Sequence, residues 1–559
     1  MKNWKILSKI KSEKRDARRE EIINVLLKNR GIMTKKQREE FFNPKISISA
    51  LQRLVSKKQL NLALERIKKA IEKKEPVVIF GDYDCDGICG TAILWETLNQ
   101  LGAKVKPYIP ERVEGYGLSK EGIEKILTPT PSLIITVDNG ITAHDAIDYA
   151  SSLGIDVVVT DHHLLPKKLP KALAIVHTTK LSGAAVAWLL AQALGPDLRP
   201  LTFGLDLVSL ATITDLVPLI GPSRVLTKIG LQQLNQTRNI GLKALISESG
   251  LRLGQIGVYE IGWILGPRLN ATGRLASAMD SLRLLCFKDV PYVKQLAQKL
   301  SELNLKRQKL TDKAFEHAKK RLEKEKLPKL IFISHPDYNE GIVGLVASKL
   351  VEEFFRPAIV GTEKGDLIRA SARSIPSFNI TEAISKGKAL LKNFGGHEMA
   401  AGLTVKKENL KALKEKILRF AESKLGERDL MPSLKVDCEV KLSDLNWKLL
   451  EKVSHLEPFG LGNPRPLFLT TGLQVTEARA VGNKQKHLKL KLDDIKTREI
   501  ERAEAEVGPT FDGIGFNLGF WGEKLREGDI IDLVYNLDKN VWNGEEILQL
   551  KVKDLRKGL

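Results

Sequence analysis

Cysteine is scarce in this chain of 559 residues, which contains four: Cys85, Cys89, Cys286 and Cys438. Their spacing provides neither the disulfide framework of a small secreted protein nor the paired cysteines of a structural zinc site. We expect Cys85 and Cys89 to be packing residues rather than metal ligands. The scarcity of cysteine is typical of a reducing compartment, and we expect a cytoplasmic protein.

Long apolar runs are also missing. No segment approaches the roughly 20 apolar residues that a membrane-spanning helix needs. The first residues, MKNWKILSKIKSEKRDARREE, contain no apolar core for secretion and carry acidic residues that a transit peptide avoids. We therefore expect no membrane association. A hydrophobic content of 43 % is nevertheless ample for the cores of several globular domains.

Acidic residues are fewer than basic residues: the chain contains 68 Asp and Glu and 89 Lys and Arg, which gives a formal net charge of +21. A charge of this size indicates a polyanionic partner, and nucleic acid is the leading candidate. The alternative is a protein that is basic without binding a polyanion.

Some of the few acidic residues gather in the segment VVIFGDYDCDGICGTAIL, where Asp82, Asp84 and Asp86 directly follow an apolar run. The run predicts a buried strand, and a helix is expected from about Gly87. Alternate side chains of an extended segment point the same way, so the three carboxylates would converge. Two such charges about 4 Å apart repel by roughly 4 kcal/mol at an effective dielectric constant near 20, and a cation relieves this repulsion. A solvated acidic turn is the alternative.

A calcium-binding EF-hand loop is excluded for this segment. Such a loop needs a bidentate Glu at its twelfth position, but counting from Asp82 leads to Ile93. A strand rather than a helix also enters the loop.

Three further segments carry similar chemistry. SLIITVDNGI ends at Asp138, IDVVVTDHHL ends at Asp161, His162 and His163, and the apolar segment LDLVSLATITDLVPLI contains Asp215. Ligands of open α/β sheets bind at the carboxyl ends of the strands, so we expect four acidic segments on one sheet to share a metal site. Imidazole together with several carboxylates suits manganese or magnesium better than zinc.

The segments GDYDCDG, VDNG, TDHH and ATITDLVPL, in this order, resemble the four motifs of the DHH phosphoesterase superfamily. Later segments resemble those of its RecJ family of single-strand-specific exonucleases, and the resemblance runs from about Pro44 to the end of the chain. These later segments are GPRLNATGRL, NEGIVGLVASKL, ASARSIPSFNITEAI, FGGHEMAAG and LEPFGLGNPRPLF. In one departure, His177 and Thr178 stand where the family has an Asn-Pro-containing segment. This shortens a loop near the site but changes none of the metal-binding positions.

The resemblance implies a site with two Mn²⁺ or Mg²⁺ ions. The metal ligands that it implies are Asp82, Asp84, Asp86, Asp138, His162 and Asp215. Asp138 is expected to bridge the ions, Asp161 to orient a histidine, and His163 to hold the scissile phosphate. The substrate-binding residues that it implies are Arg268, Asn270, Arg274, Ser371, Arg373, Gly395, Gly396 and His397.

The function implied by the resemblance is a 5′-to-3′ exonuclease that acts on single-stranded DNA in recombination and repair and releases 5′-mononucleotides by two-metal phosphodiester hydrolysis. The implied partners are single-stranded DNA and, as protein partners, a single-strand-binding protein and a helicase, and we expect a monomer. Two alternatives stay open: a hydrolase of pyrophosphate, short oligonucleotides or cyclic dinucleotides, and a scaffold without activity. The presence of every metal ligand argues against the scaffold.

The expected fold class is α/β, with two α/β lobes joined by a long helix and followed by a C-terminal OB-like β-barrel. The helix should begin beyond Pro291 and measure about 50 Å at 1.5 Å per residue. In the barrel, Asn543-Gly544 is expected to form a hairpin turn, and the candidate DNA-binding residues are His487, Lys489, Phe516 and Trp521. The predicted domains are an N-terminal helical region (1–52), a DHH catalytic domain (53–265), a linker with the long helix (266–327), a DHH-associated domain (328–425) and the OB-fold (426–559).

Overall fold

A computed structural model describes residues 2–195, 200–323, 326–494, 510–542 and 544–558 of the chain. It contains two compact units, one formed by Ile46–Leu430 and the other by Met1–Lys45 together with Met431–Leu559. Within the described residues, no helix has the length and apolar character needed to cross a membrane.

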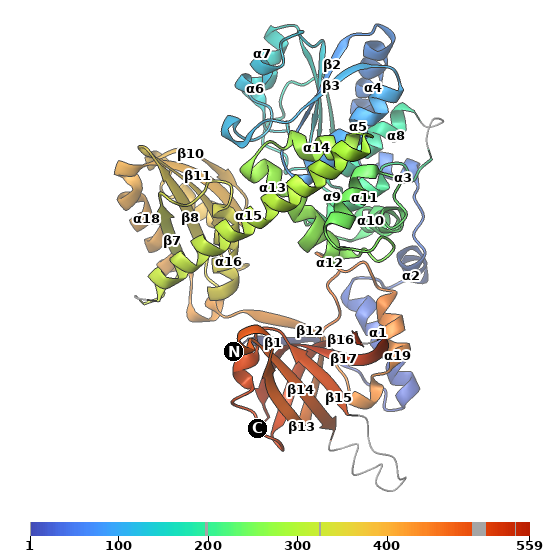
Figure 1. The fold of residues 1–559 in the computed structure, drawn as a ribbon, viewed down its shortest axis with the longest axis vertical. Helices are drawn as coiled ribbons and strands as arrows, with labels where there is room; N and C mark the ends of the chain where they lie inside the picture. Colours follow the sequence, from blue (N-terminus) through green and yellow to red (C-terminus); the bar gives the residue numbers. More distant parts are fainter. Residues whose placement is uncertain (1, 196–199, 324–325, 495–509, 543, 559) are drawn as a thin grey trace. The chain divides into compact units, whose positions relative to one another are not determined.

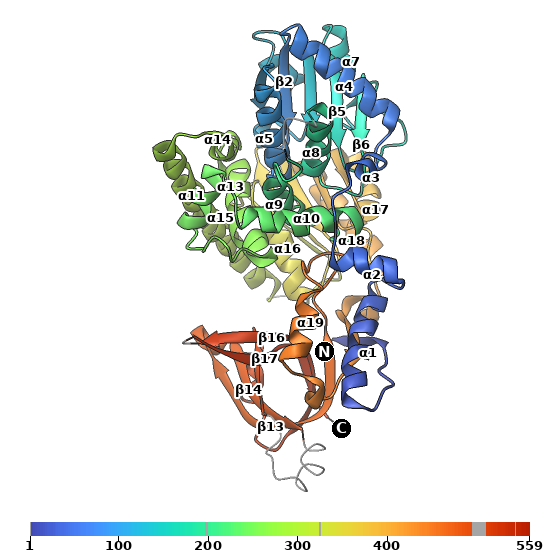
Figure 2. The same ribbon diagram turned by 90° about the vertical axis from the view of Figure 1, so that its right-hand side faces the viewer.

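The first unit begins with a five-stranded, all-parallel sheet in the order β3-β2-β4-β5-β6. Its strands are β2 (Pro76–Gly81), β3 (Lys104–Tyr108), β4 (Leu133–Val137), β5 (Asp156–Asp161) and β6 (Ala174–His177). Helices cover both faces, which is why β2, β4 and β5 are nearly continuous apolar runs (Figure 2). One face packs against α4 (Lys57–Glu72), α5 (Cys85–Gln100) and α8 (Gly183–Leu194), and the other against α6 (Lys120–Lys125) and α7 (His144–Ser152).

The chain then becomes helical, so the expected alternation of strands and helices up to Leu265 ends at β6. The helices are α9 (Leu205–Thr214), α10 (Gly221–Leu234), α11 (Ile240–Glu248), α12 (Val258–Glu260), a π-helical turn (Ile261–Leu265), α13 (Gly266–Leu275), α14 (Met279–Cys286) and α15 (Val290–Leu322). The 33 residues of α15 span about 50 Å, as the sequence predicts. Asp289 caps its first turn, and α15 leads from the first sheet region to a second sheet (Figure 1).

The second sheet of this unit has five strands in the order β10-β11-β9-β8-β7, and only β7 and β8 pair in parallel. Its strands are β7 (Ile331–His335), β8 (Ala358–Lys364), β9 (Leu367–Arg373), β10 (Leu391–Gly396) and β11 (Ala400–Lys406). One face packs against α15 and α16 (Val343–Phe354), and the other against α17 (Ile380–Ser385) and α18 (Leu410–Lys424).

The other unit contains the predicted OB-like barrel. Its strands are β12 (Ser433–Glu439), β13 (Phe468–Val481), β14 (His487–Asp494), β15 (Phe511–Gly515), β16 (Ile530–Trp542) and β17 (Glu545–Lys557). The order β13-β14-β15-β17-β16 closes through a β13–β16 pairing, and α19 (Trp447–Ser454) packs into its core. Antiparallel pairing of β16 with β17 brings Trp542 opposite Glu545, but Asn543 of the predicted turn lies outside the described residues.

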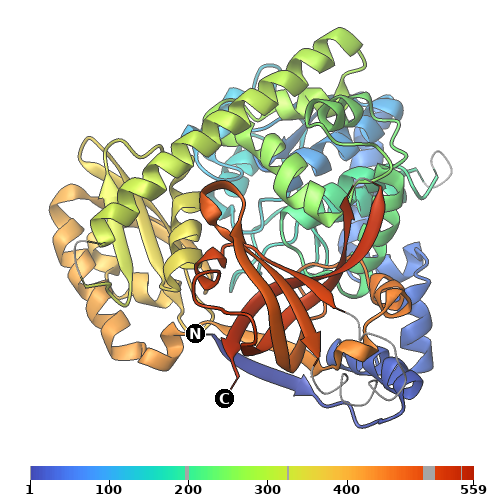
Figure 3. The ribbon, with the colours of Figure 1, turned by 60° about the horizontal axis from the view of Figure 1, so that its bottom comes forward.

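The N-terminal residues belong to the barrel unit, whereas the sequence predicts a separate helical region up to residue 52. β1 (Asn3–Ser8) pairs in parallel with β12 and lies beside the barrel (Figure 3). Ile22 and Leu26 of α1 (Arg15–Asn29) are fully buried in the barrel's core cluster, and α2 (Lys35–Phe42) follows. Arg18 donates hydrogen bonds of 3.0 to 3.2 Å to the Asp444 carboxylate.

Leu26→Ala should destabilise the barrel unit by about 2 to 5 kcal/mol, because it leaves a cavity in that core. Hydrogen exchange measured by mass spectrometry should accelerate in β12, β13 and β16 and stay unchanged in β2 and β4. Met33→Ala is the control, since Met33 is 60 % exposed. Unchanged exchange in the barrel strands of Leu26→Ala would show that α1 is not part of this unit.

Candidate metal centre

The carboxyl ends of β2, β4 and β5 meet at one edge of the first sheet and carry Asp82, Asp138 and Asp161. Asp215 reaches the same place from a different element. It is the C-cap residue of α9, so the expectation of four acidic segments on one sheet is wrong for the fourth. The three strands and this helix end nevertheless bring their carboxylates together.

The acidic loop is built differently from the extended segment that its spacing suggests. Helix α5 begins at Cys85, and the Asp84 carboxylate caps it by accepting hydrogen bonds from the backbone N–H groups of Asp86 (2.9 Å) and Gly87 (3.2 Å). Asp86 lies in the first helical turn. Its carboxylate accepts hydrogen bonds of 2.7 Å from the N–H groups of Gly183 and Ala184 at the start of α8. The helix start, rather than strand alternation, aims Asp86 at the site.

The ligand atoms form overlapping groups in which all atoms lie within 4.8 Å of one another. These groups are Asp82–Asp84–Asp138, Asp86–His162–Asp215 and Asp138–His162–His163. His162 Nε2 lies 3.1 Å from Asp138 Oδ1 and 3.6 Å from an oxygen of both Asp86 and Asp215. All six residues expected as metal ligands are therefore close together, and Asp138 occurs in two of the groups.

The buried carboxylates receive fewer hydrogen bonds than their oxygens can accept. Asp82 and Asp138 are each 2 % exposed. No described residue donates a hydrogen bond to Oδ1 of either, and the nearby His162 Nε2 is not aligned to donate one to Asp138. Burial, and then the neighbouring carboxylates, raise the pKa of both well above the ordinary range. The same causes raise the pKa of Asp215 to about 9. Carboxylate oxygens with one imidazole form a donor set that fits Mn²⁺ or Mg²⁺, and a cation would satisfy the unpartnered oxygens.

Asp161 holds the histidine pair. Its carboxylate accepts hydrogen bonds from His163 Nδ1 (2.7 Å) and from the backbone N–H groups of His162 (2.7 Å) and Ile141 (2.9 Å). Burial alone would raise the pKa of Asp161, but these hydrogen bonds lower it. Burial would likewise lower the pKa of His163, and the bond to Asp161 raises it. Asp161 therefore orients the histidines and favours a protonated His163.

Two residues near the site were not found from the sequence. The Tyr116 hydroxyl lies 3.0 Å from His163 Nε2, and the Arg112 guanidinium lies 4.4 Å from the centre of the Tyr83 ring. Both follow the carboxyl end of β3, so the strand-end rule applies to them as well. The segment KVKPY was too polar to indicate a strand of this sheet.

Helix α13 packs directly on the acidic loop. Asn270 Oδ1 accepts a hydrogen bond of 2.7 Å from the Cys85 N–H, so this side chain positions the loop. Gly273 is required for close approach, because a Cβ atom there would overlap the Tyr83 carbonyl oxygen. The loop that carries Asp82 and Asp84 is thus supported by α13.

An arginine cluster lies beside the carboxylates. Burial, and then the charges of Arg112, Arg307 and Arg373, lower the pKa of Arg274 to about 10. The side chains of Arg112, Arg274 and Arg373 donate to the carbonyl oxygens of Gly273, Gly341 and Ala372, respectively. Within the part of the chain that the structure describes, none of these four arginines forms an ion pair. Several unneutralised guanidinium groups together indicate an anion site.

The remaining residues expected to bind substrate lie further along the unit. Arg268 donates to the Ile264 carbonyl (2.8 Å) and to Ser301 Oγ (3.2 Å). Ser371 and Arg373 share β9, and both side chains lie close to Gly344 at the start of α16.

The Gly-Gly-His segment forms the end of the β10–β11 hairpin. The cross-strand register aligns Gly395 with Gly402 and Gly402 with Ser371. Gly396 has φ +143°, and the His397 N–H donates to the Ala400 carbonyl (2.8 Å). The end of the hairpin therefore lies at the same end of the sheet as the last residues of β9.

His177, one of the two residues at which the sequence departs from the family pattern, has a structural role. His177 ends β6 opposite Asp161, and its Nε2 donates a hydrogen bond of 2.6 Å to the His163 carbonyl. The residue that replaces the usual segment thus supports the backbone of the histidine pair.

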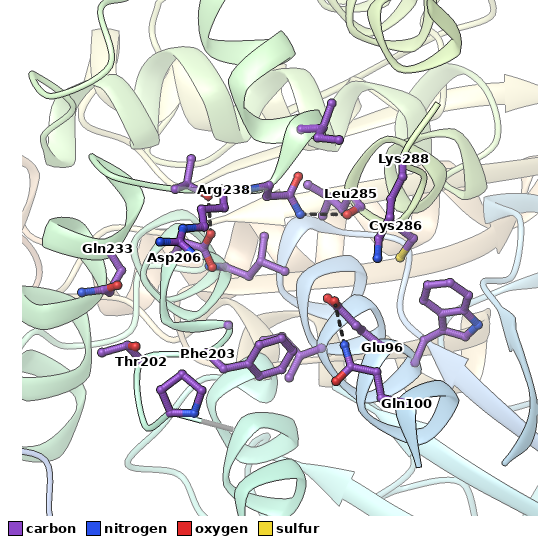
Figure 4. A pocket seen from close by; sticks show the side chains of 18 of the residues that line it. Glu96, Gln100, Thr202, Phe203, Asp206, Gln233, Arg238, Leu285, Cys286 and Lys288 are labelled. Carbon is purple, nitrogen blue, oxygen red and sulfur yellow. Dashed lines mark hydrogen bonds between the residues drawn. The ribbon is translucent and has the colours of Figure 1, made fainter. Parts of the chain in front are cut away.

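A pocket of about 950 Å³ lies at the opposite ends of α5 and α9 from the carboxylates (Figure 4). Its walls include Phe203, Asp206, Arg238 and Lys288. None of the residues expected to bind metal or substrate lines it. The pocket and the metal centre are therefore separate places in the same unit.

Three family models match the chain. They are the DHH family, N-terminal domain, over residues 76–212, the DHHA1 domain over residues 327–423, and the RecJ OB domain over residues 436–554. The first contains the three strand-end motifs and the second contains the Ser371 strand. The third contains β13 to β16 and most of β17.

The chain is 37 % identical over 511 residues to the single-stranded-DNA-specific exonuclease RecJ of Bacillus subtilis, an alignment that covers 89 % of this chain and 63 % of that protein. It is 32 % and 31 % identical over 531 residues to the proteins of the same name from Dickeya dadantii and Escherichia coli, covering 88 % of this chain and 89 % of each.

Two crystal structures of RecJ from Thermus thermophilus have the same fold. The complex with Mn²⁺ matches with a TM-score of 0.84 at 29 % identity and covers 100 % of this chain and 80 % of that one. The complex with Mg²⁺ matches with a TM-score of 0.77 at 27 % identity, covering 100 % of this chain and 79 % of that one. From the domain matches, the near-complete alignments and this shared fold, it follows that the chain belongs to the RecJ family of DHH phosphoesterases.

Proposed function

We propose that the chain is a metal-dependent exonuclease that degrades single-stranded DNA from 5′ to 3′ and releases 5′-mononucleotides during recombination and repair. The observation that carries the proposal is the cluster of six potential metal-ligating side chains next to arginines that form no ion pair with any described residue. The printed names of the relatives, and the Mn²⁺ and Mg²⁺ complexes of the Thermus protein, support it.

One cation would be held by Asp82, Asp84 and Asp138, and a second by Asp86, His162 and Asp215, with Asp138 shared between them. Divalent cations in such a pair polarise a phosphoryl oxygen and activate water for in-line attack.

The protein side chains supply binding and charge. Arg274, Arg112 and Arg373 would bind the phosphate, because guanidinium groups donate paired hydrogen bonds to its oxygens. A protonated His163, oriented by Asp161, would donate a proton or hydrogen bond from Nε2 to the phosphate as negative charge develops. Asn270 acts indirectly, by fixing the backbone at Cys85.

The barrel would bind the strand by stacking and charge. Phe516 and Phe520 are 57 % and 54 % exposed. Lys524 Nζ lies 5.2 Å from the Phe520 ring centre and 5.8 Å from that of Trp521, and His487 contacts Phe516 edge to face. Exposed aromatic rings with adjacent lysines are typical of single-strand binding by OB-folds.

The two alternative functions are weakened by these features. A scaffold has no need of unneutralised buried carboxylates, and a hydrolase of small substrates has no need of an aromatic, basic barrel surface. A cytoplasmic location, a monomeric state, and a single-strand-binding protein or a helicase as partners stay predictions.

Asp138→Asn should separate enzyme from scaffold. Asp138 has φ +63°, a conformation that Asn adopts readily, so the variant should fold. Losing the shared carboxylate should lower hydrolysis of a single strand with Mn²⁺ by about a thousandfold or more. Affinity for the strand in chelator should stay within about threefold, because the arginines are intact.

Asp148→Asn on the exposed side of α7 is the control and should keep full activity. Asp84→Ala is less suitable, because losing this cap of α5 is expected to cost about 1 kcal/mol of stability. Full activity of Asp138→Asn, or no release of nucleotides by wild type with Mn²⁺, would favour the scaffold.

The raised pKa of Asp215 predicts a pH dependence of stability. Between its usual pKa of about 4 and its raised pKa of about 9, the folded chelated protein retains a proton that the unfolded chain has released. The melting temperature in chelator should therefore fall as the pH rises through this range, and Asp215→Asn should flatten the fall. Mn²⁺ should raise the melting temperature more at high pH, because it binds ionised carboxylates. A melting temperature in chelator that rises with pH would contradict this assignment.

Point variants test the barrel better than truncation, because residues 1–45 share its core. Lys524→Ala should reduce the slope of log affinity against log salt by about 0.7, as expected for one lost phosphate contact on a single strand. Phe520→Ala should weaken binding about fivefold to hundredfold with little change of slope. Lys448→Ala, an exposed lysine of α19, is the control. Equal effects of all three variants would contradict a specific binding surface.

A further inference from the structure

An exposed aromatic pair lies on the segment before α13. Tyr259 and Trp263 are 64 % and 68 % exposed, and their ring centres are 6.5 Å apart with the planes inclined by 31°. Leu216 and Ile220, which follow the end of α9, are 69 % and 54 % exposed. Large apolar side chains exposed in this number usually mark a binding surface.

The π-helical turn explains why Trp263 faces solvent. Ile261 and Leu265 of this turn are fully buried, and Trp263 between them points the other way. π-Helical turns are rare and occur frequently at functional sites. The geometry keeps a large aromatic ring exposed on a rigid, well-packed segment.

This turn leads directly into the start of α13, which packs beside the end of α9. A Cβ atom at Gly266 would overlap the Thr214 side chain, so the start of α13 packs on the last turn of α9. Asp215 is the next residue along the chain, and its side chain is 30 % exposed. The aromatic pair thus lies on a segment whose following helix packs on the helix end that carries Asp215.

Positive charge accompanies the aromatic pair. Arg268 donates to the carbonyl oxygen of Ile264 within the π-helical turn and to Ser301 of α15. Arg307 of α15 lies near Arg268 and donates to Asn304 Oδ1 (2.7 Å), and its buried Nε donates to no other described residue. Across the described residues, neither arginine has an acidic partner in an ion pair. Aromatic rings beside unpaired arginines are complementary to nucleobases and phosphates rather than to an apolar protein surface.

We propose that Tyr259 and Trp263 form a stacking platform for the bases of the single strand beyond the bond that is cleaved, while Arg268 and Arg307 bind its phosphates. This proposal rests on the proposed function. Stacking requires unpaired bases, because the faces of paired bases are covered by their neighbours in a duplex. The platform would thus contribute to the selection of single strands close to the metal centre, independently of the barrel.

The test measures binding of a single strand of about ten nucleotides in chelator, so that no hydrolysis occurs. Trp263→Ala should weaken binding about fivefold to hundredfold, and Trp263→Phe should retain most of the affinity. The same test is a double-mutant cycle in which the second change is made in the DNA. A set of strands is used, each with a single abasic residue at a different position. One abasic position should weaken binding to wild type to a similar extent and cause no further loss in Trp263→Ala.

Phe287→Ala is the matched control, because Phe287 is 43 % exposed and forms a similar tilted pair with Tyr292, with ring centres 5.5 Å apart. It should bind every strand like wild type. Tyr259→Ala serves as a second variant if Trp263→Ala melts at a lower temperature than wild type.

The proposal is overturned if both variants bind as tightly as wild type, if the abasic losses add in full to that of Trp263→Ala, or if Phe287→Ala is equally weakened. Lower melting temperature without loss of affinity would show that the pair packs against protein. These binding results are distinguishable from failure of the proposed function, which would appear as absence of hydrolysis by wild type with Mn²⁺.

Discussion

Repulsion among buried carboxylates is the constraint around which the catalytic unit is arranged. Backbone N–H groups at the starts of α5 and α8 neutralise part of the charge on Asp84 and Asp86, and the histidine pair does so for Asp161. Among the described residues, one oxygen of Asp82 and one of Asp138 accept no hydrogen bond, although the His162 ring lies close to that of Asp138. Apolar packing of the first sheet must outweigh this cost, which explains why the strands that lead to these residues are so completely buried.

Helix α13 connects the metal-ligating loop of the site with the arginines proposed to bind phosphate. It contacts the acidic loop through Asn270 and Gly273, and Arg274 in its last turn bonds to Gly341 before α16. Metal ligands and phosphate-binding arginines thus share one rigid support. A side chain larger than hydrogen at Gly273 would displace the carbonyl of Tyr83 and disturb both at once.

The sequence allowed the strand-end carboxylates and histidines to be predicted, because buried β-branched runs and the strand-end rule are strong local signals. Asp215 was assigned to the right site on the wrong element, since a ten-residue apolar run has no periodicity that separates helix from strand. Arg112 and Tyr116 were missed because β3 is short and polar. The pairing of β1 could not be predicted, because its partner lies more than 400 residues away along the chain.

The pairing of β1 with β12 affects the order in which the two units can fold during translation. Residues 1–45 are translated before the catalytic unit, yet the strands that complete their core are translated after it. The contiguous catalytic unit can fold before residues 1–45 have found their partner strands. The chain between the two parts of the barrel unit is long, so the entropic cost of bringing them together makes barrel assembly a late step. A nascent chain would therefore possess its metal ligands before it possesses a finished barrel.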